Sequence, residues 1–454
     1  MRLAILLACA PALFAGFKAG AAWRKITPDL RENSPHQPVY LAGFGQGRRA
    51  TAVHDDLFAR CLAMSAGRDA VVICGVDAIG LFLDDVEKIR SLVKARAGRP
   101  VELIVAANHG HEGPDTLGLW GARMGVSGIV AAYNQFVIEQ TADAALAALR
   151  GMKGARLHVA KSNTPELRQL IHDSRPPVVN DAELLVMRFT TRRHKPISTF
   201  VNWANHPEAL GSKNTQISAD FLGEFYKTME TFGGGVPVFV NGAVGGMQSP
   251  LGIQIRDPRT NELAAKDSFR FAETIGQRVA DLAWEAVHNA PQTKVNRVSY
   301  REKRVKIPVA NPNFVAASKA NLYQGRKPFA ADGTSETVVG YLRLAHGNEA
   351  KVEAAAVPGE LYPELSVGGV EKFAEADFPD APVEPPIKQQ MKAPYRMLFG
   401  LANDEIGYII PKSEWDEQAP FLKGAAKRWY GEVNSIGPET APVIAKAFAE
   451  LVKQ

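Results

Sequence analysis

The chain has 454 residues, of which 46% are apolar and 22% are charged, and its formal net charge is +5. This composition is that of a folded, soluble protein, and it excludes a disordered chain. Positive charge is spread thinly, with no Lys/Arg block beyond the short segment 191–195, so a nucleic-acid partner is not expected.

The first sixteen residues differ from the rest of the chain. Arg2 is followed by an apolar run that ends near Gly16, which is shorter than the roughly 20 residues of a membrane span. A basic start followed by a short apolar run is typical of a secretory signal peptide. We therefore expect a signal peptide at 1–16, one large domain at 17–454 and a secreted or periplasmic protein. A buried N-terminal strand or helix is the alternative.

Apolar periodicity predicts strands and helices that mix throughout the chain. Val86, Ile89 and Val93 fall on one face of a helix that Asp84 can cap. The expected helices are 84–97, 128–150, 268–288 and 438–453. The expected strands are a hairpin at 56–78, then 101–108, 183–191, 197–204, 236–240, 297–309, 337–346, 353–357 and 406–411. The Pro-rich stretch 377–396 is expected to be a loop or lid. The fold class is mixed α/β, with large mixed sheets flanked by helices.

Two cysteines lie opposite each other in the predicted hairpin. A turn centred on Gly67 and Arg68 pairs Cys61 with Cys74. Opposed cysteines can form a disulfide in an oxidising compartment. Two buried thiols are the alternative, and the sequence leaves both open.

The segment after the predicted strand 101–108 carries two imidazoles. His109 and His111 are separated by one residue, so both can point to the same side. Neutral imidazole is a good zinc ligand, and nearby Glu112 and Asp115 could orient a ligand histidine or accept a proton. A hydrogen-bonded polar loop is the alternative interpretation.

A third imidazole follows the predicted strand 197–204. His206 precedes Pro207, which restricts the backbone before it. Together with the first motif it supplies the three imidazoles that a catalytic zinc often has. The run at 109–114 is similar to the H-x-H-x-D-H pattern of metallo-β-lactamase-type hydrolases, but Glu112 and Gly113 stand where two ligands should be. The eight regular strand–helix units of an amidohydrolase barrel are not visible either.

Five short motifs in the same order resemble the neutral/alkaline, non-lysosomal ceramidases over about residues 17 to 454. Together with an opening strand near "FKAGAAWRKITP", they are "NHGHEGP" at 108–114, "NHPE" at 205–208, "GMQSP" at 246–250, "VPGE" at 357–360 and "NDEIGY" at 403–408. The resemblance implies a Zn²⁺ site formed by His109, His206, Glu360 and Tyr408.

The same resemblance implies roles around that metal. Two histidines, a carboxylate and a phenol leave room for a water, whose pKa zinc lowers towards ~7. Tyr408 could also hydrogen-bond the developing oxyanion, and His111 could donate a proton to the leaving amine. Ser249 matches the serine of the substrate site, with nucleophilic attack as its alternative role. Gly245 and Gly246 would let the backbone approach the substrate.

The implied activity is zinc-dependent hydrolysis of the amide bond of an N-acylated substrate, such as a ceramide-like lipid, with contact to a membrane surface. The motifs depart from the family at Glu112, at 115–121, at Met247 and at Gln248. These departures concern the substrate more than the metal. A zinc-dependent esterase of the same fold and a non-catalytic ligand-binding surface protein are therefore kept as alternatives.

Overall fold

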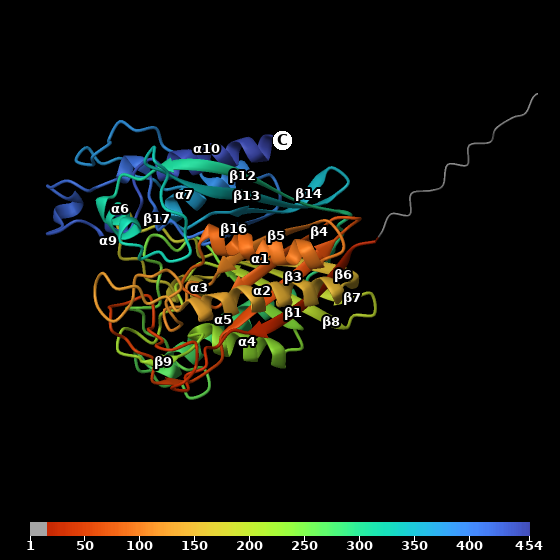
Figure 1. Cartoon of the computed structure of the whole chain (residues 1–454). Coiled ribbons are helices and arrows are strands. Elements are labelled where there is room, and N and C mark those ends of the chain that lie inside the picture. Colours follow the sequence, from red (N-terminus) through yellow and green to blue (C-terminus); the bar gives the residue numbers. More distant parts are fainter. Residues whose placement is uncertain (1–15) are drawn as a thin grey trace, which may run out of the picture.

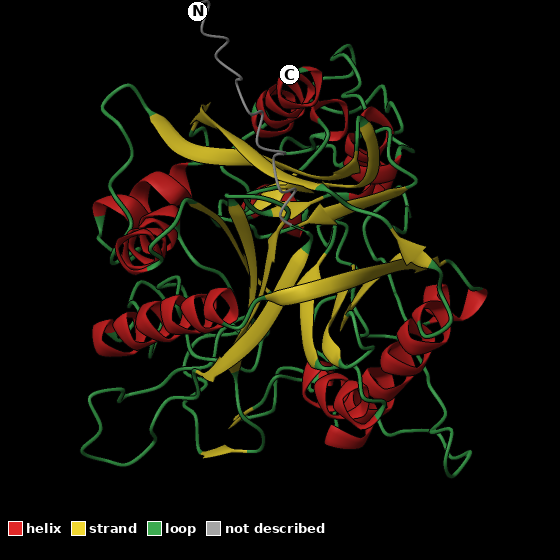
Figure 2. Cartoon of the chain, turned by 90° about the vertical axis from the view of Figure 1, so that its right-hand side faces the viewer, coloured by secondary structure: helices red, strands yellow, loops and turns green. Residues whose placement is uncertain are grey.

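Two β-sheets stacked face to face form the centre of the molecule, and helices cover their outer faces (Figure 1). The computed structural model describes residues 16–454, so the predicted signal peptide lies outside the described residues except for Gly16. Figure 2 shows the smaller sheet above the larger one, with the C-terminal helix above both. Within 16–454, no helix combines the length and the apolar character needed to cross a bilayer.

The larger sheet has nine strands in the order β10-β8-β7-β6-β1-β3-β4-β5, with β11 paired to β6. The pairs β10–β8 and β4–β5 are parallel, and the others are antiparallel. Its strands are β1 (Lys18–Lys25), β3 (Phe58–Ser65), β4 (Ala70–Val76), β5 (Val101–Ala107), β6 (Lys153–Ser162), β7 (Leu184–Thr191), β8 (Pro196–Trp203), β10 (Val236–Asn241) and β11 (Gln292–Thr293).

Both faces of this sheet are buried. In β3, Cys61 and Ala63 pack toward the helices, whereas Leu62 and Met64 pack toward the second sheet. This alternation follows from the two-residue period of a strand. The helices on the outer face are α1 (Leu83–Arg96), α2 (Ala131–Arg150), α4 (Phe221–Thr231) and α5 (Phe269–Val287).

The second sheet has four strands and is covered by the last helix. Its strands are β12 (Arg297–Pro308), β13 (Thr334–His346), β14 (Glu349–Ala356) and β16 (Tyr395–Phe399). Leu342, Val352 and Met397 face the larger sheet. On the other side, Phe448 of α10 (Thr440–Lys453) packs with the buried Tyr341. The order of layers is therefore helices, nine-stranded sheet, four-stranded sheet and helix.

Two edges of the larger sheet are brought together by the segment that follows β16. On β5, Ala107 N donates to Leu401 O at 3.1 Å, and Asn403 N donates to Val105 O at 2.7 Å. On β10, Asn241 O accepts from Gly400 N at 3.0 Å. The segment 400–403 therefore joins strands that end the sheet on opposite sides.

Gly75 of β4 permits this close approach. A side chain at Gly75 would place its Cβ 2.1 Å from Phe239 O of β10. No residue other than glycine fits that gap without moving β10. The curl of the sheet thus requires a glycine at the point where β4 crosses β10.

The remaining elements are short and lie mostly around one end of the sheets. They are β2 (Ala52–Val53), α3 (Pro165–Gln169), β9 (Gln216–Ile217), α6 (Pro312–Lys319), β15 (Glu360–Leu361), α7 (Pro363–Val367), α8 (Ile387–Gln390), β17 (Tyr408–Ile409), α9 (Tyr430–Val433), and two 3-10 turns at Lys412–Glu414 and Leu422–Gly424.

The mixed α/β prediction is confirmed, with three local corrections. Asp84 does not cap α1: the cap position is Phe82, and Leu83 N donates instead to Asp404 Oδ1 at 2.9 Å. Strand β6 and helix α4 were not predicted, although buried Ala155, Leu157 and Val159 alternate along β6. The Pro-rich stretch 377–396 is largely a loop, but it contains α8 and the first residues of β16.

The predicted pairing of the cysteines is confirmed. Cys61 and Cys74 are register partners in β3 and β4. Their sulfur atoms form a disulfide. The alternative of two buried thiols is therefore wrong.

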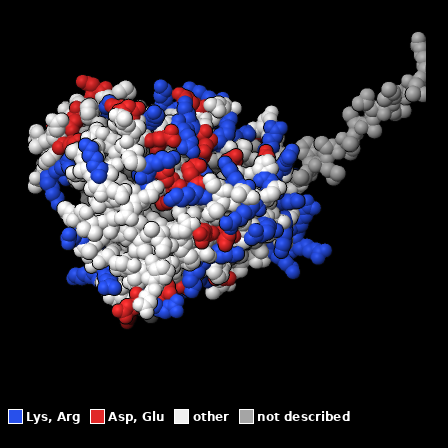
Figure 3. Space-filling view, viewed as in Figure 1, with Lys and Arg blue, Asp and Glu red and all other residues white. Residues whose placement is uncertain are grey.

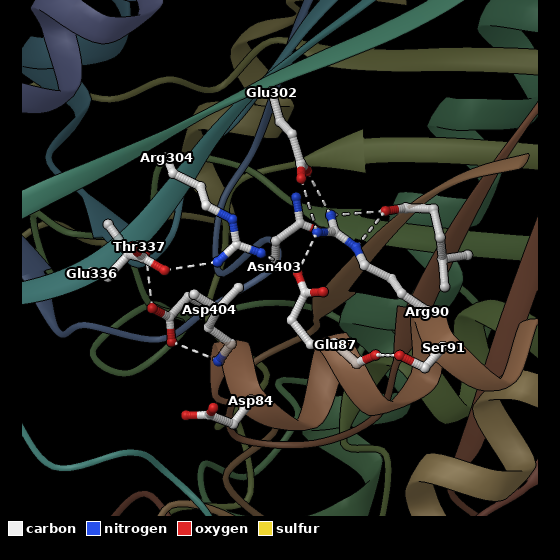
Figure 4. Close-up of polar contacts among 12 residues, drawn as sticks. Asp84, Glu87, Arg90, Ser91, Glu302, Arg304, Glu336, Thr337, Asn403 and Asp404 are labelled. Atoms are coloured by element: carbon white, nitrogen blue, oxygen red, sulfur yellow. Dashed lines mark hydrogen bonds and ion pairs between the residues drawn. The ribbon is translucent and has the colours of Figure 1, made fainter. Parts of the chain in front are cut away.

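An ion-pair network joins α1 to the second sheet (Figure 4). Arg90 bonds Leu103 O at 3.0 Å, Glu302 at 2.8 Å and Glu87 at 2.9 Å. Arg304 of β12 also bonds Glu87, at 3.0 Å. Figure 3 shows acidic and basic side chains interleaved over α1 and β12, whereas the lower left of that view carries few charges.

The two arginines of this network should differ in their contribution to stability. Arg90 is 5% exposed, so Arg90→Met leaves a carbonyl and a carboxylate without their partner and should cost about 2–4 kcal/mol. The Arg304 side chain is 47% exposed, so Arg304→Met should cost less than about 1 kcal/mol. Denaturant unfolding of both variants measures the difference, and equal losses would contradict it.

Candidate metal centre and active site

His109 and His206 follow strands that lie at opposite sides of the larger sheet. His109 comes two residues after β5 and His206 three residues after β8. The curl of the sheet brings them together, and their ring centroids lie 5.0 Å apart. His111 joins them at 5.1 Å from His109 and 5.6 Å from His206.

Asn241, the last residue of β10, fixes the two histidine-bearing segments. Its Nδ2 donates to Asn108 O at 3.0 Å and to Asn205 O at 2.9 Å, while its Oδ1 accepts from Asn205 N at 3.0 Å. Asn108 and Asn205 directly precede His109 and His206. One buried amide therefore sets the distance between both imidazoles.

Glu360 and Tyr408 come from a separate pair of short strands. β15 and β17 are parallel, and Glu360 and Tyr408 are register partners in them. Gly359 permits this pairing, because a Cβ there would lie 2.5 Å from Gly407 O. Gly245 N donates to Leu361 O at 2.9 Å and so attaches β15 to the segment after β10.

The carboxylate of Glu360 lies between the two imidazoles. Glu360 Oε2 is 3.1 Å from His206 Nε2 and 3.5 Å from His109 Nε2. Ligand atoms at 2.0–2.1 Å from a tetrahedral zinc are separated by about 3.3 Å. The spacing of these three atoms therefore fits a zinc ion.

The other ring nitrogens are already used. His109 Nδ1 lies 2.6 Å from Ile79 O, and His206 Nδ1 lies 2.7 Å from Gln248 O. Each Nδ1 donates to a carbonyl, so each Nε2 is left with a lone pair for a metal. The nitrogens of His109, His111 and His206 also form a group whose ligand atoms lie within 4.8 Å of one another.

Without a cation, the charges of this cluster balance among themselves. Burial opposes the imidazolium of His206, but Glu360 and Glu208 outweigh it and raise the pKa of His206 to about 9. Burial also opposes ionisation of Glu360, but His109 and His206 outweigh it and lower the pKa of Glu360 below its usual range. A divalent cation would take the place of the proton in this pairing.

The backbone of His109 is strained. Its φ is +64°, in the left-handed region that non-glycine residues rarely adopt. Hydrogen bonds from His109 N and Gly110 N to Ala78 O hold that conformation. Strain of this kind is concentrated at functional sites.

Tyr408 lies against the carboxylate of Glu360. Burial and the nearby Glu360 raise the pKa of Tyr408 well above its ordinary value. Its hydroxyl donates to Met247 Sδ at 3.3 Å. Glu405 lies close to Glu360 as well, and burial together with that charge raises the pKa of Glu405 well above its ordinary value.

Glu208 links the other two predicted site residues and was missed in the sequence. Its Oε1 accepts the hydroxyl hydrogen of Ser249, and its Oε2 lies 3.1 Å from His111 Nδ1. Burial lowers the pKa of His111 to about 4, despite the attraction of Glu208. The available signal in the sequence was the position of Glu208 two residues after His206, a candidate ligand.

Glu112 and Asp115 do not orient a ligand histidine, so that interpretation is wrong. Glu112 pairs with Arg48 at 2.5 Å and accepts from Asn214 Nδ2 at 2.9 Å. Asp115 accepts backbone N–H bonds and closes its own loop; the donors are Leu117, Gly118, Trp120 and Gly128. Both carboxylates organise the loops around the site.

The two predicted glycines are placed away from the pocket surface. A Cβ on Gly245 would lie 2.4 Å from Glu360 O, so Gly245 allows β15 to approach. A Cβ on Gly246 would meet Asp173 Oδ2 at 3.0 Å, and Gly246 is not among the residues that line the pocket. Gly246 therefore lies behind the pocket and does not face it together with the other predicted residues.

A cavity of about 610 Å³ opens over this cluster. The residues at its polar end are His109, His111, His206, Glu208, Ser249, Glu360, Glu405 and Tyr408. Its remaining walls are largely apolar and include Phe82, Leu117, Trp120, Phe314, Tyr323 and Phe329. His172 also lines it. The arrangement is that of a deep apolar pocket with a cluster of potential metal ligands at one end.

Asn241 can be tested against a matched asparagine. Asn241→Leu should leave buried backbone groups of Asn108 and Asn205 unpaired, at about 2–4 kcal/mol of stability, and should weaken Zn²⁺ binding. Asn202 is also buried, and its amide bonds Val240 O, Leu398 O and the backbone O of Asn241, without touching Asn108 or Asn205. Asn202→Leu should lose stability yet keep the Zn²⁺ affinity of the wild type. Equal Zn²⁺ affinity in both variants, measured by competition with a chelating dye, would contradict the role of Asn241.

Comparison with known proteins gives a clear result only at the level of structure. No model of a protein family matches the chain, and no curated protein matches it in sequence. A crystal structure of neutral ceramidase from Pseudomonas aeruginosa superposes with a TM-score of 0.72 and 15% identity, covering 97% of this chain and 75% of that one. A ceramidase complexed with C2 gives 0.70 and 15%, covering 96% and 75%. The chain therefore has the fold of the neutral ceramidases.

Proposed function

We propose that this protein is a zinc-dependent hydrolase that cleaves the amide bond of an N-acylated substrate, a ceramide-like lipid or a related N-acyl compound. The observation that carries the proposal is the spacing of Glu360 Oε2 from His206 Nε2 and His109 Nε2, 3.1 and 3.5 Å. The shared fold with neutral ceramidases supports the same chemistry.

His109, His206, Glu360 and Tyr408 would hold the metal. When bound, zinc supplies an activated water and polarises a carbonyl. The carbonyls of Ile79 and Gln248 keep the Nδ1 hydrogens of the two histidines, which orients each Nε2. The phenol of Tyr408 can donate a hydrogen bond to the developing oxyanion.

His111 would accept at Nε2 the proton that the attacking water loses and pass it to the leaving nitrogen, because its lowered pKa of about 4 leaves the ring neutral near pH 7. Its Nε2 has no hydrogen-bond partner among the described residues, although the ring is buried. The backbone of Gly43 packs directly against the ring, so closely that a Cβ there would lie 2.2 Å from His111 Cγ. Phe44 packs beside it, with its ring centroid 4.9 Å away. A fixed imidazole beside the metal cluster is suited to proton transfer.

The shape of the pocket supports a substrate with a long apolar part. Its walls away from the cluster are formed by apolar side chains of the loop 117–124 and of the segment 312–329. Met124 at this end of the pocket is 82% exposed, so an apolar chain or a lipid surface could meet the protein there. Because 115–121 departs from the ceramidase pattern, the acyl group could differ from that of ceramide.

An esterase of the same fold remains the second candidate, because the same metal chemistry cleaves both bonds. A non-catalytic ligand-binding protein is disfavoured, since four predicted ligand positions come from distant segments to line one end of one pocket. We also propose that the protein is exported, with residues 1–16 as the signal peptide. The Cys61–Cys74 disulfide supports export, because disulfides persist in oxidising compartments.

Metal analysis and amide hydrolysis test the proposal together. The purified protein should contain about one zinc per chain, and chelation should abolish hydrolysis of an N-acyl amide. His109→Ala should lose both the metal and at least about 99% of the activity. His194→Ala, in an exposed hairpin turn, should retain both. Amide hydrolysis that persists in a chelator-treated, zinc-free enzyme would refute the proposal.

A further inference from the structure

One carboxylate binds two different site residues. Glu208 follows His206 and Pro207 and is 4% exposed. Its Oε1 accepts the hydroxyl hydrogen of Ser249, and its Oε2 lies 3.1 Å from His111 Nδ1. One oxygen therefore accepts a hydrogen bond from Ser249, and the other contacts the imidazole of His111. The three side chains all line the pocket next to the metal-binding end.

The hydroxyl of Ser249 has a defined direction. A serine hydroxyl offers one hydrogen and two lone pairs. The hydrogen goes to Glu208, and one lone pair accepts from Leu251 N at 3.0 Å. Paired backbone bonds between Ser249 and His172, at 2.8 and 3.0 Å, hold the residue itself. What remains for a ligand is a single acceptor lone pair.

We propose that Glu208 is a positioning residue that holds Ser249 as a hydrogen-bond acceptor and thereby selects substrates whose scissile group carries an N–H. A secondary amide can donate that hydrogen bond, whereas an ester oxygen and a tertiary amide nitrogen cannot. The inference rests on the proposed function and adds to it the reason why an amide is favoured over an ester.

The geometry explains why one carboxylate serves both partners. Because Ser249 and His111 contact the same carboxylate, the distance between the serine hydroxyl and the imidazole is fixed. Both groups therefore face the same region of a bound substrate. Turning Ser249 into a donor would leave Glu208 Oε1 buried without its partner, which is costly. A site built to accept an N–H discriminates strongly against analogues that lack it.

Glu208→Gln tests the positioning role, because its amide keeps the shape but can no longer accept with both ends. Ser249→Ala removes the acceptor altogether. The probes are a p-nitroanilide and a p-nitrophenyl ester with the same acyl chain. Glu353→Gln is the matched control: Glu353 is also buried, but it binds Tyr341 and the backbone at 392–393, outside the pocket.

Relative to the wild type, Glu208→Gln and Ser249→Ala should each lower kcat/KM for the anilide by about 10–100-fold more than for the ester. Combining them should add little, since both break one hydrogen-bonded pair. An N-methylated anilide has no N–H, so as an inhibitor it should bind the wild type more weakly than the secondary anilide does. In both variants the two affinities should become similar. Zinc content and the thermal midpoint should stay close to those of Glu353→Gln.

An unchanged preference between anilide and ester in Ser249→Ala would overturn the inference, whatever happens to Glu208→Gln. If Glu208→Gln loses zinc or unfolds early, the serine variant alone decides. A wild-type enzyme that cleaves neither probe and contains no zinc would remove the proposed function together with this inference. Cleavage of both probes with a selectivity that neither variant alters would remove the inference alone.

Discussion

The closure of the curled sheet is the constraint on which the site depends. Its two parallel strand pairs, β4–β5 and β10–β8, stand at opposite ends of the strand order. They meet because Gly75 leaves room for β10, and because the segment 400–403 bonds both edges. Every group proposed to bind a metal is attached to this junction. A sheet that stayed open would hold the same histidines too far apart to share an ion.

Asn241 transmits that closure to the side chains. It bonds the residues before His109 and His206 with one amide group. A buried amide with several partners is rigid, since every broken bond would leave a polar group without water. The second sheet contributes in a similar way, because β14 and β16 lead directly into the segments that carry Glu360 and Tyr408. Two layers thus bring the proposed ligands to one point.

The sequence predicted the parts of this molecule that have local signals. Strand ends followed by polar residues pointed to His109 and His206, and the hairpin turn predicted the pairing of Cys61 with Cys74. Glu360 and Tyr408 came only from resemblance, because their neighbourhood is created by a two-residue strand pair with no periodicity to detect. The fold could be predicted as a class, but its strand order could not.

Residues whose roles depend on distant partners were not predicted from the sequence, or were predicted to have a different role. Glu208 stands in the NHPE motif without an assigned role, Asn241 lies outside the quoted motifs, and both roles exist only once the sheet has closed. Glu112 and Asp115 stand beside a ligand histidine in sequence, yet their bonds go to Arg48 and to a loop backbone. Asp84 was predicted to cap α1, but the carboxylate that accepts from Leu83 N belongs to Asp404, in a loop 321 positions away. Proximity in sequence was a poor guide to hydrogen bonding at these sites.

The left-handed backbone of His109 sets the stability of this loop against its side chain. Glycine or asparagine would occupy that conformation with less strain, so folding alone would favour either residue over histidine. An imidazole at this position therefore makes the loop less stable than glycine would, at the point where the ring faces the proposed metal centre.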